Sequence, residues 1–393
     1  MRELLLTRAG RYVAGLVGLL AILTSVGIAL LWPSGEKAVE AAPGTTGEVV
    51  QAEVTEIMEV PCQAPEAENC AQVSAALRSG PDEGSTSTFS TGESVSSVAV
   101  SVGDDVRLMK NQIDPSAPVQ GEPYTFLDFE REDALIWLAV AFGVVVVLFG
   151  RLRGAMSLLG LGASLVVVFA FLVPAMLSGT SPVVVAAVGA SAVMLLTISL
   201  AHGLGAKSMA AILGTTASLA VTIGLALLFS ELAYLTGFGS EESSLILIGD
   251  SSISLRGLVI AGIVIGALGV LDDVTVSQSS TVMALRRSSP DLRFRELFRE
   301  ALDVGHDHVA ATVNTLVLAY VGASLPILLI FSISGVEVSD ALNHEAVAEQ
   351  IVGMLVGSIG LIAAVPITTA LAGMLAVRLP AEALGRGEPL HTH

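Results

Sequence analysis

The sequence has little charge, few aromatic residues and almost no cysteine. Only 14% of its 393 residues are charged and 5% are aromatic, whereas 53% are hydrophobic. Charged residues make up about a quarter of an ordinary soluble domain, so this composition excludes that class. Uncharged runs of about 20 residues recur along the chain, and this is the length that a helix needs to cross a bilayer.

Several catalytic signatures are missing as well. The chain has no H-E-x-x-H zinc sequence, no G-x-S-x-G nucleophile turn and no glycine-rich loop of the Walker A or Rossmann type. We therefore expect no enzymatic activity, no cofactor and no metal site. The 37 acidic residues outnumber the 19 basic ones, and this excess of negative charge argues against a nucleic-acid partner.

The uncharged runs predict an α-helical polytopic membrane protein with about eight transmembrane helices. The first run follows a basic start and ends without a small-residue cleavage site, so we interpret it as an uncleaved signal anchor. Lys and Arg follow every second span, and they concentrate on the cytoplasmic side. Both termini are therefore expected in the cytoplasm, in a bacterial plasma membrane. The predicted spans are residues 12–32, 134–150, 156–177, 182–200, 209–235, 257–276, 309–331 and 351–377.

Residues 33–133 form the one long polar segment, and the alternation of spans places them outside. They carry 19 of the 37 acidic residues and 5 of the 19 basic ones. Short runs of alternating polarity, separated by Gly, Pro and Ser, predict about five strands. We expect a small extracytoplasmic all-β domain, of barrel or sandwich type. The predicted parts are thus 1–32 (tail and anchor), 33–133 (β domain), 134–377 (seven-helix membrane domain) and 378–393 (cytoplasmic tail).

The two cysteines, Cys62 and Cys70, lie in the sequence PCQAPEAENC within the outside segment. Disulfides persist outside the cytoplasm, so we expect these two residues to be bonded as a structural staple. Free thiols are the alternative. A metal site is not expected, because no histidine lies near them.

The stretch GALGVLDDVTVSQSSTV, residues 266–282, places two aspartates where a membrane helix should continue. The uncharged run before Asp272 covers about 21 Å at 1.5 Å per residue, which is short of a hydrocarbon core about 30 Å thick. We predict that the helix continues to about residue 279. Ionisable residues inside spans usually face the bundle interior or water, and Asp272 and Asp273 point in directions about 100° apart.

The next span, DVGHDHVAATVNTLVLAYVGASLP, begins with polar residues at a matching depth. Spans joined by one hairpin tend to be neighbours, so we expect one aspartate within reach of Asn314 or Thr315. Such a cluster could relay protons or ions. Alternatively, the aspartates pair with Arg286 or Arg287 at the interface and the other groups join helices. The candidate relay residues are Asp272, Asp273, Ser277, Gln278, His306, His308, Thr312, Asn314 and Thr315.

These two motifs, with YTFLDFERED before the second span, resemble the YibE/F family of bacterial multi-span membrane proteins. The resemblance covers approximately residues 49 to 375. It implies a β domain followed by seven spans, but it does not indicate which activity the protein has. GVLDDVTV and the helix around FRELFREAL are more weakly similar to the SecD/SecF export subunits of the RND superfamily. Those subunits have six spans and duplicated porter domains, so this similarity concerns the fold.

Two functions are compatible with these features. The leading hypothesis is an ion-gradient-coupled transporter or exporter of unknown substrate that uses Asp272 or Asp273. The alternative is a non-catalytic membrane scaffold whose outside β domain binds an envelope protein or an exported partner. In both cases the lipid bilayer surrounds the helices.

Overall fold

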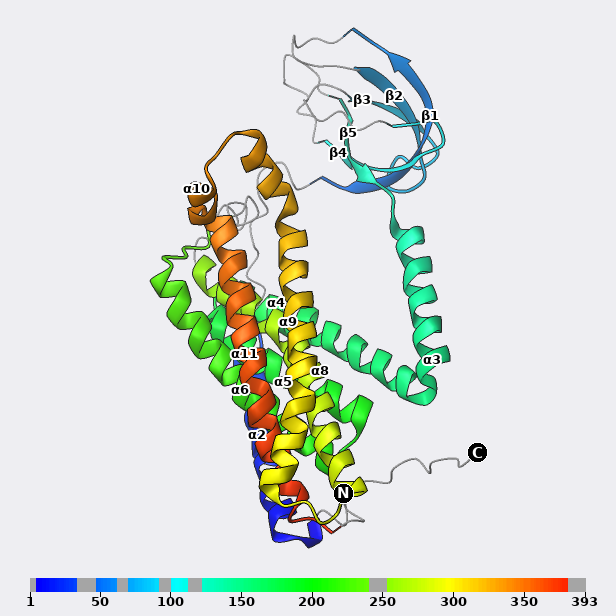
Figure 1. Cartoon of the computed structure of the whole chain (residues 1–393). Helices are drawn as coiled ribbons and strands as arrows, with labels where there is room; N and C mark the ends of the chain where they lie inside the picture. The colour runs from blue at the N-terminus through cyan, green and yellow to red at the C-terminus, as the bar shows by residue number, and fades with distance from the viewer. Residues whose placement is uncertain are drawn as a thin grey trace, which may run out of the picture. The chain divides into compact units, whose positions relative to one another are not determined.

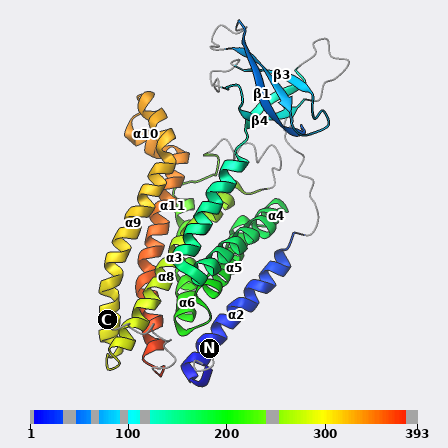
Figure 2. The same cartoon turned by 90° about the vertical axis from the view of Figure 1, so that its right-hand side faces the viewer.

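The computed structural model describes residues 5–33, 47–61, 70–91, 100–111, 122–239 and 253–380. The chain divides into two compact units, residues 41–145 on the one hand and residues 1–40 with 146–393 on the other. The first unit is built around a curled antiparallel sheet, and the second is a bundle of long helices (Figures 1 and 2).

Among the described residues, the sheet has five antiparallel strands in the order β3-β2-β1-β4-β5, in agreement with the predicted number of about five. Its apolar residues alternate along the strands and meet in one core, where Val54, Phe89 and Leu108 are almost fully buried. The sheet curls so that Phe89 of β3 stacks on Phe126 of β5, with 5.9 Å between the ring centroids. The strands are β1 (Val49–Glu59), β2 (Ala71–Leu77), β3 (Thr86–Thr91), β4 (Asp105–Lys110) and β5 (Tyr124–Phe129).

A polar cluster links the turn before β3 to the last two strands. Asp82 Oδ2 lies 2.6 Å from both Tyr124 Oη and Lys110 Nζ. Burial, followed by the hydrogen bond to Asp82, raises the pKa of Tyr124 to about 12. Cys70, directly before β2, is buried and disulfide-bonded. Its predicted partner, Cys62, lies outside the described residues.

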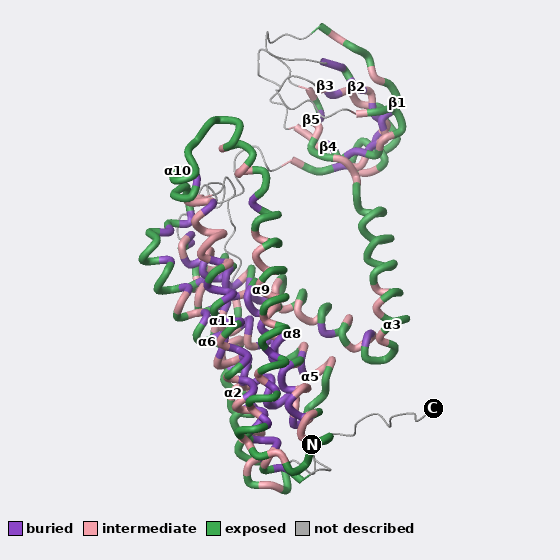
Figure 3. The backbone as a smooth tube through the Cα atoms, viewed as in Figure 1, coloured by how far each residue is buried: buried purple, intermediate pink, exposed green. Residues whose placement is uncertain are grey.

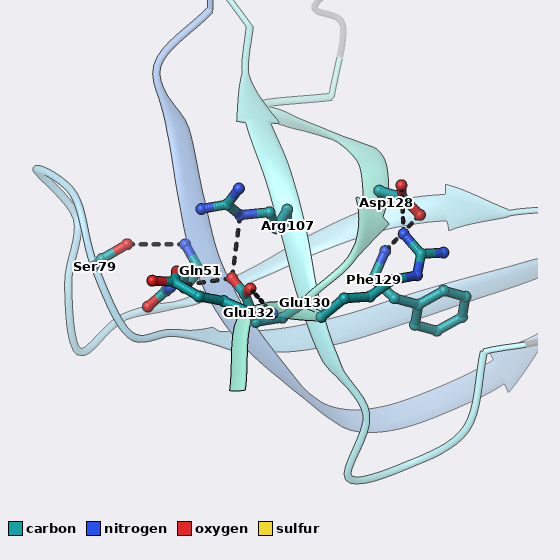
Figure 4. Close-up of polar contacts among 8 residues, drawn as sticks. Gln51, Ser79, Arg107, Asp128, Phe129, Glu130 and Glu132 are labelled. Carbon is teal, nitrogen blue, oxygen red and sulfur yellow. Dashed lines mark hydrogen bonds and ion pairs between the residues drawn. The ribbon is translucent and has the colours of Figure 1, made fainter. Parts of the chain in front are cut away.

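Glu130 fastens the sheet to the first turn of helix α3 (Glu132–Val167). Gln51 Nε2 of β1 donates to Glu130 Oε2 over 3.0 Å, and Arg107 Nε of β4 lies 3.1 Å from the same oxygen. The backbone N–H of Glu132 donates to Glu130 Oε1 over 3.0 Å, and this bond contributes most to lowering the pKa of Glu130 (Figure 4). One carboxylate thus joins two strands and a helix start.

Seven helices in the described part of the chain are long and apolar enough to cross a membrane, as expected for a multi-pass membrane protein. One is a composite of α3, the π-helix η1 (Val168–Leu172) and α4 (Val173–Leu177). The short helix α10 (Val338–Asn343) is not among the seven. The other six are α2 (Arg8–Leu31), α5 (Pro182–His202), α6 (Ala206–Leu232), α8 (Leu255–Ser288), α9 (Phe294–Ile333) and α11 (Glu345–Ala376).

The structure therefore has one such helix fewer than the eight spans that the sequence predicts. The predicted spans 134–150 and 156–177 fall in one helical run, Glu132–Leu177, without a loop between them. The run is interrupted at Arg151, where φ is 50° and ψ is −132°. The basic residues there mark the position of the break, but the chain changes direction within one residue. The parts before and after it, 132–150 and 152–177, are each close to the ~20 residues of a spanning helix.

Helices α6, α8 and α11 provide most of the core of the helical unit. In the most apolar window of α8 and of α11, 50% of the residues are buried, against 6% in α9. Figure 3 shows this contrast, with buried positions gathered along α6, α8 and α11 and exposed positions along α9. Helix α8 contacts α5, α6, α9 and α11, so its side chains meet four other helices.

Helices α6 and α11 cross in a reciprocal arrangement of glycine and threonine. A Cβ placed on Gly214 of α6 would lie under 3.0 Å from the Thr368 hydroxyl of α11, and one on Gly360 of α11 would lie equally close to the Thr222 hydroxyl of α6. Thr222 and Thr368 are fully buried. Each threonine therefore occupies the space that the facing glycine leaves, and this allows close helix contact in a membrane.

The crossing gives a stability prediction. Gly214→Ala should destabilise the protein by about 1–3 kcal/mol, because the added methyl group overpacks the contact with Thr368. Gly224→Ala on the same helix is the matched control, since a Cβ there meets nothing within 4 Å. It should leave stability unchanged or raise it by up to ~1 kcal/mol. Thermal unfolding of the detergent-purified protein measures both changes. Equal effects of the two substitutions would contradict the packing argument.

Candidate functional site

Helix α8 carries the aspartate pair and runs unbroken from Leu255 to Ser288. The prediction that it continues past Asp273 to about residue 279 is confirmed. Two hydroxyl groups in this part bond within the helix: Thr275 donates to the carbonyl of Asp272 and Ser279 to that of Val276. Asp272 lies 17 residues after Leu255, or about 26 Å along the axis at 1.5 Å per residue.

Three polar residues of α8, which we name the α8 polar row, are Asp272, Thr275 and Gln278. They are spaced three apart, so each is displaced by about 4.5 Å and turned by about 60° from the one before. Each side chain consequently meets a different neighbour. Asp272 bonds to α5, Thr275 to α6, and Gln278 to both α9 and α11.

Asp272 is the ionisable member of the α8 polar row. Its Oδ2 atom lies 2.9 Å from Thr197 Oγ1 of α5. The same Thr197 oxygen lies 3.2 Å from the backbone carbonyl oxygen of Met194. Asp272 Oδ1 is buried and has no hydrogen-bond partner within the described residues. Leu271 and Val274 beside it are also buried, so the carboxyl group sits in apolar surroundings with a single polar contact.

Thr275 forms the second link, from α8 to α6. Its hydroxyl oxygen lies 2.6 Å from that of Thr215, and both residues are fully buried. The Thr215 hydroxyl also lies 3.0 Å from the carbonyl oxygen of Ala211 in its own helix. The two hydroxyl groups thus satisfy each other and the backbone, as is common between membrane helices.

Gln278 forms the third link and holds three helices together. Its Nε2 group donates to the carbonyl oxygen of Ala301 in α9 and to Thr369 Oγ1 in α11, each over 2.7 Å. Thr369 donates in turn to the carbonyl of Val365. Gln278 is 4% exposed. The sequence marks it as a relay candidate, but its contacts are those of a structural clamp.

The other candidates on α8 and α9 lie at the surface of the helical unit. Asp273 and Ser277 are exposed, and so are His306 and His308. His308 is an ionisable neighbour that acts electrostatically on Asp273. Thr312 is partly exposed, and its hydroxyl bonds to the carbonyl of His308.

The described residues do not show the expected hydrogen-bonding contact between an aspartate and Asn314 or Thr315. Both residues are exposed, and Thr315 donates to the carbonyl of Ala311 in its own turn. No hydrogen bond joins either residue to Asp272 or Asp273 in the part of the chain that is described. Depth along a helix does not fix the direction in which a side chain points. Asp272 turns toward α5, whose Thr197 the sequence analysis did not single out.

The geometry limits the chemistry of the site. Among the described residues, no group of three or more His, Cys, Asp or Glu side chains is arranged to hold a metal ion. The α8 polar row contains one carboxyl group and otherwise uncharged hydroxyl and amide groups. Such a site can bind and release a proton or a small cation at Asp272, but it offers no nucleophile with an activating base.

Gln278→Leu tests the clamp. The substitution keeps the size of the side chain and removes the two hydrogen bonds to α9 and α11, so we expect a loss of about 1–3 kcal/mol in stability. Thermal unfolding in detergent measures the change. Ser277→Ala at the exposed neighbouring position should stay within ~0.5 kcal/mol of the original protein. A Gln278→Leu protein as stable as this control would show that the clamp contributes nothing.

Comparison with known proteins identifies the family of this chain. No curated protein and no solved structure matches the chain. The model of the family described as YibE/F-like protein matches residues 138–378, which is more than half of the chain. The matched region contains α5, α6, α8, α9 and α11, and with them the whole α8 polar row. The chain belongs to the YibE/F-like family.

Proposed function

We propose that this membrane protein moves a substrate across the bacterial plasma membrane and couples that movement to an ion gradient through Asp272. The observation that carries the proposal is the carboxyl group of Asp272, held between α5 and α8 with one oxygen buried and unpartnered. A carboxyl group at membrane depth is costly, and such groups commonly mark ion or proton pathways. A purely structural link between α5 and α8 would not need an ionisable residue.

Asp273 and His308 supply an approach to Asp272 in this proposal. Asp273 adjoins Asp272 in sequence but lies exposed, where His308 acts on it. An imidazole and a carboxyl group at the edge of the membrane can exchange protons or attract cations from water. We place this edge on the cytoplasmic side, because the basic residues of the connections gather there. Both termini lie on that side if residues 132–150 and 152–177, the two parts of the interrupted run, each cross the membrane. Residues 33–133 are then outside.

Ion movement in vesicles tests the proposal. The full-length protein is reconstituted with a pH-sensitive or a cation-sensitive dye inside, and a gradient of the corresponding ion is imposed. We expect the intact protein to carry one of these ions and Asp272→Asn to reduce the movement to that of empty vesicles. Ser277→Ala, an exposed change on the same helix, is the matched control. Unchanged movement in Asp272→Asn would refute coupling through this residue.

A scaffold function is the second candidate, and the sheet unit favours it. This unit has its own apolar core, and Glu130 fastens it to the first turn of α3. A groove of about 780 Å³ lies along this joint. Its polar lining includes Arg107 and Arg131, and Phe129 and Ile136 are among its apolar residues. A sheet held in this way could present a fixed surface to an envelope protein or an exported partner.

Removal of residues 47–129 separates the two candidates. A transporter driven through Asp272 should still carry ions in vesicles, because the side-chain hydrogen bonds that the described residues show for the α8 polar row go to α5, α6, α9 and α11, which belong to the helical unit. A scaffold should carry no ions before or after the deletion. Its sheet unit should instead capture a defined protein when cross-linked in cells. The absence of such capture, together with ion movement, would exclude the scaffold.

A further inference from the structure

We infer that the ion bound at Asp272 is a proton, and that the packed arrangement of α5 and α8 described here is the proton-loaded one. This inference rests on the proposed function, and it specifies the coupling ion that the proposal leaves open. It follows from the number of hydrogen atoms available around the Asp272 carboxyl group.

The Thr197 hydroxyl has two oxygen neighbours but a single hydrogen atom. Its oxygen lies 2.9 Å from Asp272 Oδ2 and 3.2 Å from the carbonyl oxygen of Met194. An ionised carboxylate and a carbonyl group are both acceptors only. If Asp272 were ionised, Thr197 could donate fully to only one of these two oxygens. The Met194 carbonyl oxygen lies inside α5 and would keep its helical backbone hydrogen bond. The carboxylate, however, would have Thr197 as its one donor within the described residues, on Oδ2, and none on Oδ1.

A neutral Asp272 removes this conflict. With the proton on Oδ2, the acid donates to Thr197 Oγ1, and the Thr197 hydroxyl donates to the carbonyl oxygen of Met194. Every hydrogen then has an acceptor, and each of the two short oxygen–oxygen distances corresponds to one hydrogen bond. Asp272 Oδ1 remains as an uncharged carbonyl oxygen without a partner. A neutral oxygen left unpartnered costs much less than one that carries part of a negative charge.

The charged groups on the surrounding helices do not compensate the negative charge that an ionised Asp272 would carry. The neighbouring Asp273 would add a second negative charge, and His308 of α9 acts on Asp273. His202 lies at the end of α5 and Lys207 in the first turn of α6, and neither forms an ion pair with Asp272 in the described part of the chain. The nearest ionisable residues of α11, Glu345 and Glu349, stand at its other end.

A bound metal cation fits the site poorly. Hard cations take six or more oxygen ligands. Within the described residues, Thr197 Oγ1 is the one side-chain oxygen that forms a hydrogen bond with the Asp272 carboxyl group, and Oδ1 has no hydrogen-bond partner. The pairs of Thr215 with Thr275 and of Gln278 with Thr369 are satisfied among themselves. A proton needs only the acceptor that Thr197 supplies.

Infrared spectroscopy of the full-length protein in lipid vesicles tests this inference without measuring transport. A protonated carboxyl group has a C=O stretching band that a carboxylate lacks. We expect the spectrum of the intact protein minus that of Asp272→Asn to contain this band near neutral pH. The band should lie at the high frequency of a carbonyl without hydrogen-bond donors and should shift in D₂O. Asp273→Asn is the matched control: because it keeps Asp272, subtraction of its spectrum from that of the intact protein should give no such band.

Two variants of Thr197 test the hydrogen-bond chain. Thr197→Ser keeps the hydroxyl group and should preserve the band, whereas Thr197→Val removes the acceptor of the acidic proton and should shift it. A role of Thr197 in packing alone predicts no difference in the band between these two variants. Such a result would overturn the assignment of the proton to the Asp272–Thr197 pair.

Further outcomes separate this inference from the proposed function. Only carboxylate bands in the difference spectrum, or loss of the band on replacing potassium with sodium, would overturn the proton as the bound ion. Sodium movement in the vesicle assay, without the band of a protonated carboxyl group, would support coupled transport but reject the proton as the coupling ion. A band of the protonated carboxyl group without any ion movement would support a protonated Asp272 and reject coupled transport.

Discussion

The arrangement of the helical unit depends on one constraint, which is that polar groups inside a bilayer must find their partners within the protein. Helix α8 carries more polar residues than a lipid-facing helix could tolerate, and its position between four helices satisfies them. The α8 polar row distributes three side chains over α5, α6, α9 and α11. The same residues that make α8 unsuitable for contact with lipid therefore specify its neighbours.

The small residues of α6 and α11 provide the space in which this is possible. The contacts of Gly214 with Thr368 and of Gly360 with Thr222 let the two helices approach closely. Thr215 then meets Thr275 of α8, and Thr369 meets Gln278, each one residue away from a member of the crossing. Close packing and hydrogen bonding thus occur at the same level of the bundle. If α6 or α11 moved away from α8, it would lose its hydrogen bond to the α8 polar row.

Composition and periodicity predicted the elements of the fold. They did not predict features that depend on the direction in which a side chain points or the chain turns. Strand number, the position of most helices and the continuation of α8 past Asp273 follow from hydropathy and length. The break near Arg151 was expected as a loop between two spans, but the chain turns there within a single residue, which basic side chains alone do not reveal. Thr197 was overlooked because a lone hydroxyl in an apolar helix usually bonds to its own backbone. Only the orientation of α5 reveals that it also faces Asp272.

Asp272 differs from the rest of the α8 polar row because its contact depends on its charge state. Thr275 and Gln278 bind α6, α9 and α11 with uncharged groups, so those links persist whatever the pH. Ionisation of Asp272 would leave a buried charge with at most one donor, and an uncompensated buried charge costs several kcal/mol. Separation of α5 and α8 at Thr197 would give the buried Oδ1 atom access to water. Since α8 is fastened to the other three helices, the loss of the proton would act on its contact with α5, which gives a chemical event at one carboxyl group a defined structural consequence.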